Sequence, residues 1–462
     1  MSSAPVSENK EKNREQWGSR LGYILSTVGM AFGLGAIWRF PYLTAQNGGG
    51  SFVLAFTIIT IVIAVPAGMA EIAFGRKMRN GTIESFRKIL GEKGKYIGWI
   101  FPLVPMCLNM FYFVVVSWTL VYTLYSLFSG TMMTDPIGFF NGFMENKTAI
   151  FAWTVVTTIL IAIICLKGIK GGIEKFCLYG IPLAFLLLVV LMVRVFFLPG
   201  AMDGVIMMAR PDLEQMMDPS MWSRAAGMAL FAIGLGPSYL TAFGRYLPEK
   251  SNIPMDFLAV AWWNLFGCVV AGFAIVPAVV AFGLDLQSGP ALTYLTLPYV
   301  FAQMPFSRLI AFMFFLTMLL AGLSSAIANL ETSATTIGDS LGWSRTKAII
   351  IVSIVIILGA IPCIWDEAFL AKFDFLVGDV GYTLTASLMA CVLAWYVGSK
   401  KIRLTMLMPG SSIRIGSWFD FIYKYVACPV LLFMFIQSLM NIPKIFFHCD
   451  PVYGVALIRC RE

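Results

Sequence analysis

The stretch GMAFGLGAIWRFP, residues 29–41, lies inside an apolar segment long enough to cross a bilayer. It nevertheless contains three glycines, a proline and Arg39. Glycine and proline weaken a helix, and a charged side chain is costly in hydrocarbon. We therefore expect this segment to be a membrane helix that is interrupted for a functional reason.

The composition places the whole chain in a membrane. Of its 462 residues, 59% are hydrophobic and 13% are charged, and the mean hydropathy is +0.81. Such a chain lacks the polar surface that a soluble domain needs, so we expect an all-α polytopic membrane protein. Apolar windows of about 18 residues or more predict eleven membrane-spanning helices, near residues 22–46, 51–74, 97–128, 149–166, 176–198, 222–243, 256–284, 308–338, 348–365, 373–398 and 418–441.

The basic residues predict how these helices are oriented. Loops rich in Lys and Arg stay on the cytoplasmic side of a membrane. With a cytoplasmic N-terminus, most of the 33 Lys and Arg residues fall on the inner side, including the basic segment 75–96. We read the net charge of +8 as this topology signal rather than as a nucleic-acid surface. The prediction is a multi-pass protein of the inner (plasma) membrane, surrounded by lipid and without a nucleic-acid partner.

Enzymatic and ATP-driven functions have no support in the sequence. The chain has a single His, no HExxH or GxSxG pattern and no Walker motif. The cysteines form no metal-binding pattern, and most of them lie in apolar segments. An odd number of spans puts the C-terminal tail outside the cell, where Cys449 and Cys460 either pair or remain free thiols.

A second interrupted segment resembles the first. Residues 231–240 read FAIGLGPSYL, and their GLG repeats the GLG of residues 33–35. Each lies in the first span of a five-span block, and two blocks of five spans have opposite orientations, so the repeat must be inverted. Matched Gly/Pro interruptions in inverted halves mark the midplane binding site of a transporter. We expect an N-terminal segment (1–20), a first repeat (21–200), an inverted second repeat (201–400), and an eleventh span with the tail (401–462).

Four stretches carry a family resemblance: REQWGSRLGYILSTVGMAFGLGAIWRFPYLTAQNGGGSF (14–52), SWTL (117–120), LAGLSSAIANLET (320–332) and FDFLVG (373–378). Together they resemble the neurotransmitter:sodium symporter family, whose bacterial amino-acid transporters define an inverted 5+5 fold with discontinuous first and sixth helices. The short outer loops without a cysteine pair are similar to those of the bacterial branch. We expect a monomer or a weak homo-oligomer, and no enzymatic activity, since no nucleophile and base pair is visible.

The resemblance implies a sodium site of the type that relatives use as their second one. Unwound helices supply carbonyl oxygens and hydroxyl groups complete the cage. The implied ligands are the carbonyl groups of Gly29, Phe32 and Ala321 and the side chains of Ser324 and Ser325.

A first sodium site and a chloride site are not expected. Relatives have an asparagine and a threonine where this chain has Ala36 and Ala232, and their seventh-span asparagine falls on Trp263 or, with a shift of one, on Asn264. Their chloride-site tyrosine and glutamine are replaced by Phe56 and Met228, and Gly267 offers no substitute carboxylate. The cofactor prediction is therefore one sodium ion and no chloride.

The resemblance also implies a substrate pocket for an amino acid or a close derivative. Its residues are Ala31, Gly33, Leu34, Gly35, Leu108, Tyr112, Phe231, Ala232, Gly234, Pro237, Ser325 and Asn329. A substrate carboxylate would be held by the amides of residues 33–36, the positive end of the second half-helix and the Tyr112 hydroxyl; alternatively the substrate is cationic or carries no carboxylate. Asn329 either contacts the substrate or bonds to a neighbouring helix.

Two sets of residues are implied to close the pocket on its two sides. Arg39 and Asp374 match the outer pair, above a lid of Tyr112 and Phe231. The inner set is Arg14, Trp17, Tyr246 and Asp339. The roles of two further acidic residues are left open. Glu331 has no assigned role, and Asp379 is either a partner for a cationic substrate or a proton acceptor.

Sodium-coupled symport is the leading functional prediction. A substrate-gated sensor or leak channel on the same scaffold, and a proton-coupled transporter using Asp379 or Asp374, are the alternatives.

Overall fold

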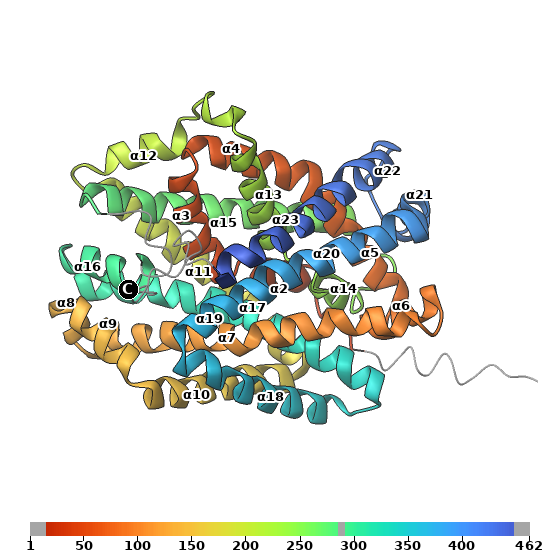
Figure 1. Cartoon of the computed structure of the whole chain (residues 1–462), viewed down its shortest axis with the longest axis horizontal. Helices are drawn as coiled ribbons and strands as arrows, with labels where there is room; N and C mark the ends of the chain where they lie inside the picture. Colours follow the sequence, from red (N-terminus) through yellow and green to blue (C-terminus); the bar gives the residue numbers. More distant parts are fainter. Residues whose placement is uncertain (1–14, 285–291, 448–462) are drawn as a thin grey trace, which may run out of the picture.

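The computed structural model describes residues 15–284 and 292–447. Arg14, Cys449 and Cys460 lie outside the described residues, so the predictions made for them stay open. The described residues fold into long helices that run side by side, with no strand among them (Figure 1). In Figure 1 the short helices α8, α9 and α16 lie at one end of the molecule, and α6, α21 and α22 lie at the other.

The elements of the first half of the chain come first. They are α2 (Arg20–Ala31), η1 (Gly35–Arg39), α3 (Phe40–Gln46), α4 (Gly50–Ile59), η2 (Thr60–Ala64), α5 (Val65–Met78), α6 (Thr82–Leu90), α7 (Gly94–Phe128), α8 (Thr131–Thr134), α9 (Pro136–Glu145), α10 (Lys147–Leu166), η3 (Ile169–Glu174) and α11 (Lys175–Phe196). The elements η1, η2 and η3 are π-helical turns.

The second half follows with α12 (Ala201–Ala209), η4 (Gln215–Met217), α13 (Pro219–Ile233), α14 (Tyr239–Gly244), α15 (Ile253–Ala281), η5 (Leu292–Thr296), α16 (Leu297–Ala302), α17 (Ser307–Leu341), α18 (Arg345–Trp365), α19 (Glu367–Asp374), η6 (Phe375–Gly381), α20 (Tyr382–Cys391), η7 (Val392–Gly398), α21 (Ser399–Ile402), η8 (Arg403–Leu407), α22 (Trp418–Phe421), η9 (Ile422–Ala427) and α23 (Cys428–Phe447). In this half η4 is a 3₁₀ turn, and η5 to η9 are π-helical.

Nine helical segments in the described residues are long and apolar enough to cross a membrane, and the bent pair α2 and α3 makes up to ten. They match ten of the predicted windows. The remaining window, 222–243, is divided between α13 and α14, neither of which is long enough to span a bilayer by itself. The predicted all-α transporter fold with discontinuous first and sixth helices is confirmed.

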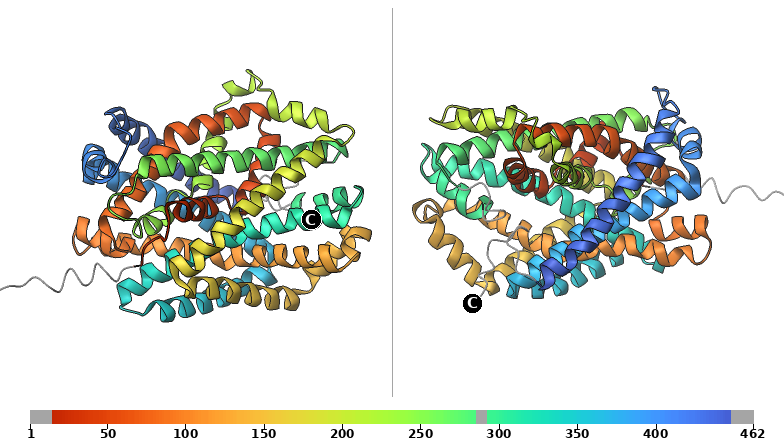
Figure 2. Two further views of the ribbon diagram at one scale, coloured as in Figure 1. Left: turned by 180° about the vertical axis from the view of Figure 1, so that it is seen from behind. Right: turned by 45° about the horizontal axis from the view of Figure 1, so that its top comes forward.

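The third and eighth spans are long, continuous helices that pack on each other. Both α7 and α17 contain 35 residues, which corresponds to roughly 50 Å of helix. They pack along each other, and α2 packs on α17 and on α11. Figure 2 shows the helices from behind and with the top of the molecule tilted forward. The two interrupted helices therefore lie against continuous ones, which hold the interruptions in place.

Candidate functional site

The first interruption follows Ala31, where α2 ends. Phe32 leaves the helix with φ −81° and ψ 68°, and the axes before and after the break differ by 53°. Gly33 lies so close to two other helices that a Cβ atom there would be 2.5 Å from the Ser325 hydroxyl and 3.1 Å from the Tyr112 hydroxyl. A residue without a side chain is needed at this position.

The second interruption covers residues 234–238, between α13 and α14. Gly234, Gly236 and Ser238 all have positive φ, at 76°, 109° and 63°, a region that glycine enters without steric cost. Pro237 cannot donate a backbone hydrogen bond. The Gly236 N–H donates to the Glu71 carboxylate at 3.2 Å. This uncoiled backbone is buried, so its polar groups face protein or a ligand rather than lipid.

The predicted sodium ligands from α2 and α17 come together. The Ser324 hydroxyl donates to the Gly29 carbonyl at 2.7 Å and lies 2.8 Å from the Ala321 carbonyl. The Ser325 hydroxyl lies 3.1 Å from the Gly29 carbonyl and 3.0 Å from that of Met30. Hard cations bind oxygen ligands of this kind, and unwound helices supply them in transporters. The donor set fits a sodium ion.

Phe32, the fifth predicted ligand, is the C-cap residue of α2. The last carbonyl groups of a helix lack partners within that helix, so its carbonyl group is of the right kind to complete the cage. Met30 was not predicted, although its carbonyl accepts from the same hydroxyl as that of Gly29. It belongs to the last turn of α2, whose carbonyl groups are all candidates by this rule.

Part of the predicted substrate set also gathers at the first interruption. The Leu34 N–H donates to the Tyr112 hydroxyl at 3.3 Å. Gly35 faces Phe231, because a Cβ atom on it would lie 2.3 Å from that ring. With Gly33 against Ser325, these contacts join the first, third, sixth and eighth spans around one point.

The other predicted substrate residues lie in the protein interior. Buried positions are occupied by Ala31, Leu108, Ala232, Gly234 and Pro237.

Asn329 is 4% exposed, and its side chain makes no hydrogen bond to the described residues. Both readings of Asn329, a substrate contact or a bond to a neighbouring helix, stay predictions. Tyr382, which sequence reasoning missed, donates to the Phe231 carbonyl at 3.4 Å and packs on its ring at 5.4 Å.

On the predicted outer side, Arg39 pairs with Asp379 and not with Asp374. Its Nη2 atom lies 3.0 Å from Oδ1 of Asp379, and its guanidinium group lies 5.5 Å from the centre of the Phe231 ring. Asp374 precedes η6 and Asp379 lies within it. Because π-helical hydrogen bonds join residues five apart, both carboxylates face the same side and Asp379 reaches Arg39. The expected partner is corrected to Asp379, which an α-helical reading of the sequence does not place on that face.

On the opposite side, several polar groups form what we call the inner cluster. It contains Trp17, Tyr246, Arg245, Asp339, Glu331 and Arg345. Arg245 pairs with Asp339 at 2.8 Å, and Arg345 pairs with Glu331 at 2.7 Å. The Tyr246 hydroxyl donates to the other Glu331 oxygen at 2.9 Å. Arg245, Arg345 and the role of Glu331 were missed, although a carboxylate inside a span needs a cationic or hydrogen-bonding partner.

Trp17 packs on this cluster from the segment before α2. Its Nε1 atom donates to the Phe243 carbonyl at 3.0 Å, and its ring packs edge-on against Tyr246 at 6.3 Å. Glu15 adds an ion pair with Arg345 at 2.9 Å. A cavity of about 290 Å³ opens beside these residues. With Arg39 and Asp379 joined on one side and the inner cluster joined on the other, contacts close the interruptions from both ends.

The positions of a first sodium site offer few ligands. Ala36 and Ala232 are buried at 2% and 1% exposure and have no side-chain donor. Trp263 is 41% exposed and packs on Phe185 and Phe266. Asn264, in contrast, is fully buried, and both polar atoms of its amide lack a partner in the described residues. Of the two aligned positions, only Asn264 faces the interior.

The chloride position is filled by apolar groups. Phe56 is fully buried against Phe40, with ring centres 4.9 Å apart, and Met228 is 2% exposed. At Gly267 a Cβ atom would lie 2.5 Å from the Phe32 ring. These groups cannot donate to an anion, so the residues present do not fit chloride.

Comparison with known proteins agrees with this geometry. The model of the sodium:neurotransmitter symporter family matches residues 14–135 and 140–457. An uncharacterized sodium-dependent transporter of Haemophilus influenzae is 31% identical over 93% of this chain and 99% of its own length. The sodium-dependent transporter YhdH of Bacillus subtilis is 30% identical over 92% and 98%.

More distant relatives include the human sodium- and chloride-dependent GABA transporter 2, which is 29% identical over 72% of this chain and 64% of its own. Among solved structures, MhsT in complex with L-phenylalanine superposes with a TM-score of 0.84 at 29% identity, over 92% of this chain and all of MhsT. The family model covers nearly the whole chain, and the fold and the interrupted helices agree with it. The chain belongs to the sodium:neurotransmitter symporter family and is a sodium-dependent membrane transporter, not an enzyme.

Proposed function

We propose that the chain imports an amino acid or an amino-acid derivative together with one sodium ion, without chloride, by alternating access. The observation that carries the proposal is the convergence of the Ser324 and Ser325 hydroxyls on the Gly29 carbonyl, at 2.7 and 3.1 Å. These oxygens come from two helices, and one of the helices is interrupted next to them. A cation bound there would couple its own binding to the position of the interrupted helix.

A single sodium ion follows from what surrounds the interruptions. Ala36 and Ala232 supply no side-chain oxygen, which leaves Asn264 as the one side chain of the aligned first site with an oxygen atom. One amide without carboxylate or hydroxyl neighbours is a weak cation ligand. The apolar Phe56 and Met228 argue in the same way against a chloride requirement.

The substrate class is inferred from the polar groups at the first interruption. The Tyr112 hydroxyl and backbone amides near Leu34 suit a carboxylate, and no acid stands at Gly33 to meet an amine. MhsT, which shares the fold, was solved with L-phenylalanine. Asn329, whose amide has no partner among the described residues, would recognise a polar group on the substrate side chain.

Transport would proceed by opening one set of closing contacts while the other remains joined. The Arg39–Asp379 pair, next to the Phe231 ring, would open toward the outside. The inner cluster, with Trp17 anchored on Phe243, would open toward the cytoplasm. We place the N-terminus in the cytoplasm and the protein in the plasma membrane from the distribution of basic residues, and we propose a monomer or a weak homo-oligomer.

The test is uptake of radiolabelled amino acids into proteoliposomes that contain the purified protein. We expect accumulation with an inward sodium gradient, none with potassium, and none with a pH jump alone. Accumulation driven by the pH jump would favour the proton-coupled alternative. Binding of substrate without accumulation against a gradient would favour a sensor or leak channel.

A further inference from the structure

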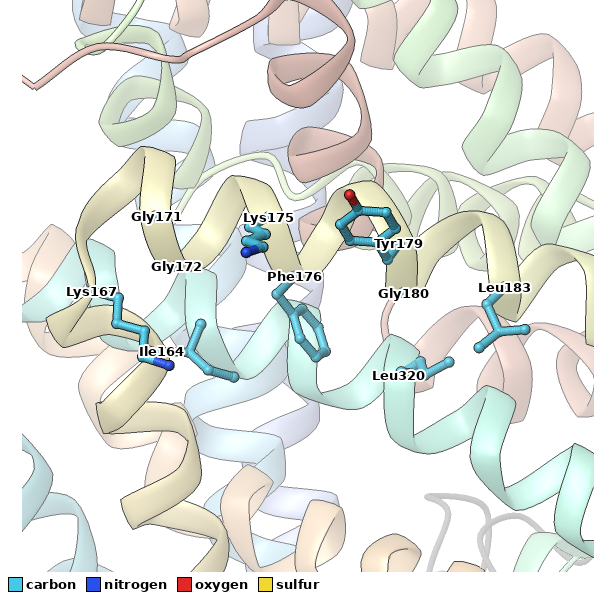
Figure 3. A pocket seen from close by; sticks show the side chains of 10 residues that line it. All are labelled: Ile164, Lys167, Gly171, Gly172, Lys175, Phe176, Tyr179, Gly180, Leu183 and Leu320. Atoms are coloured by element: carbon cyan, nitrogen blue, oxygen red, sulfur yellow. The ribbon is translucent and has the colours of Figure 1, made fainter.

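We propose that a groove between α10, η3, α11 and α17 binds one anionic phospholipid. The groove has a volume of about 390 Å³ and is open on one side. It is separate from the two interruptions, and the transport proposal does not require it. Figure 3 shows it running along α11, with Lys167 and Lys175 toward one end and Leu183 toward the other.

The polar end of the groove carries two positive charges. Lys167 follows α10 and Lys175 begins α11, and both are exposed. Neither forms an ion pair with the described residues, and no Asp or Glu lines the groove. The nearby Glu174 is turned away, because its carboxylate accepts from the Gly18 N–H at 2.6 Å and from the Ser19 hydroxyl at 2.7 Å. An anion near the two lysines would therefore meet no competing carboxylate from the lining.

The rest of the groove is apolar and continues onto the lipid-facing surface. Phe176 and Leu320 form its floor between α11 and α17 (Figure 3). Beyond Leu183, α11 exposes Leu186 at 60%, as expected for a side that faces hydrocarbon. Tyr179 is 73% exposed at the middle of the groove, and tyrosine favours the boundary between headgroups and hydrocarbon. A site with this order, basic and then aromatic and then apolar, fits a phosphate headgroup followed by an acyl chain.

Small residues make the groove wide enough for a chain. At Gly171 a Cβ atom would meet nothing within 4 Å. At Gly180 it would meet Leu320 at 3.6 Å and Phe176 at 3.7 Å, which are ordinary van der Waals contacts with the floor. A larger side chain at Gly180 would consequently enter the groove without displacing the protein.

Occupation of the groove would act on the transport machinery through α11. On its opposite side α11 contacts α2, where a Cβ atom on Gly29 would lie 2.9 Å from Ile181. A lipid in the groove would thus press on the helix that supports a proposed sodium ligand. This makes lipid composition a determinant of the stability of the proposed sodium site.

The test is native mass spectrometry of the delipidated full-length protein, titrated with dioleoylphosphatidylglycerol or with dioleoylphosphatidylcholine. We expect one tight phosphatidylglycerol molecule and at least tenfold weaker binding of phosphatidylcholine. Lys167→Gln with Lys175→Gln should weaken phosphatidylglycerol about thirtyfold, from ~1 kcal/mol per basic residue at a membrane surface. Lys400→Gln with Lys401→Gln, which removes two exposed charges elsewhere, should leave this tight binding unchanged.

Gly180→Leu gives a second test that leaves all charges in place. It should abolish the tight adduct and also the rise in melting temperature that phosphatidylglycerol gives to the unaltered protein. The proposal is overturned if the two lipids bind equally, if the Lys400/Lys401 variant loses as much affinity as the groove variant, or if Gly180→Leu binds normally. None of these results affects the transport proposal, which is tested by uptake.

Discussion

The hydroxyl of Ser324 lies 2.7 Å from the carbonyl oxygen of Gly29, although 295 residues separate them in the chain. The contact joins the last turn of α2 to the middle of α17. Because α2 ends two residues after Gly29, any movement of the interrupted helix changes this distance. A cation held between the two helices would resist that movement.

Loss of the two hydroxyls should remove the sodium response. We expect Ser324→Ala with Ser325→Ala to weaken sodium binding at least tenfold, because two of the five proposed ligands disappear. A thermal-shift titration with sodium chloride against potassium chloride measures the effect. Ser333→Ala is the matched control, since among residues 15–284 and 292–447 its hydroxyl bonds only to the Asn329 carbonyl, within α17. An equal loss in the control would show that the effect is not local.

A single coupled sodium sets a limit on accumulation. At about 100 mV the charge gains ~2.3 kcal/mol and a tenfold gradient adds ~1.4 kcal/mol, which together allow roughly 500-fold accumulation of a neutral substrate. We expect a sodium Hill slope near one and accumulation below this limit in proteoliposomes. A Hill slope near two, or accumulation well above the limit, would contradict the single site.

A substitution at Asn264 also tests whether the protein has a single sodium site. A buried amide without partners costs about 1–3 kcal/mol, so Asn264→Leu should raise the stability of the protein by about 1 kcal/mol and leave sodium affinity unchanged. Thermal unfolding with and without sodium measures both quantities. If the variant loses sodium affinity, Asn264 is a ligand and a second site exists.

The two acids near Arg39 should behave differently. Asp379→Asn removes the partner of Arg39 at 3.0 Å and should reduce the uptake rate about tenfold or more, with a smaller effect on substrate affinity. Asp374→Asn leaves that ion pair in place and should have the smaller effect on rate. Initial uptake rates and equilibrium binding on the same preparations separate the two effects. If Asp374→Asn reduced the uptake rate more than Asp379→Asn, Asp374 would be the functional partner of Arg39.

The two carboxylates of the inner cluster should differ in their effect on stability. Glu331 is 0% exposed and pairs with Arg345, and removing one member of a buried pair costs about 3–5 kcal/mol. Asp339 is 46% exposed, where an ion pair contributes about 0–1 kcal/mol. We expect Glu331→Gln to lower the melting temperature far more than Asp339→Asn. Similar shifts for the two variants would mean that the Glu331 pair does not behave as a buried ion pair.

Chloride replacement should have no effect. Uptake in sodium gluconate should equal uptake in sodium chloride, because Phe56, Met228 and Gly267 provide no donor for an anion. Sodium is held constant in both buffers, which makes the comparison its own control. A chloride-dependent rate would require an anion site that the aligned positions do not suggest.

Much of the fold was predictable from local sequence. Apolar windows located most spans to within a few residues, because a bilayer accepts only helices of sufficient length and apolarity. Both interruptions were predicted at the correct residues. In the second one, for example, Gly234, Gly236 and Pro237 have backbone preferences that do not depend on the rest of the fold. The window 222–243 was predicted as one span, and its division into α13 and α14 follows from the same residues.

The partners of charged groups were not predictable in this way. Asp374 and Asp379 are both carboxylates close to the same helix end, and only the π-helical course of η6 brings Asp379 to Arg39. Trp263 and Asn264 were both candidates for the position of the relatives' seventh-span asparagine. Deciding between them likewise required knowing which of the two adjacent side chains points inward. The sequence by itself determined the membrane environment, the spans and the two interruptions, since these follow from the hydropathy and backbone conformation of neighbouring residues. Only the tertiary structure decided which oxygens converge and which ions pair, because those distances depend on how helices hundreds of residues apart pack together.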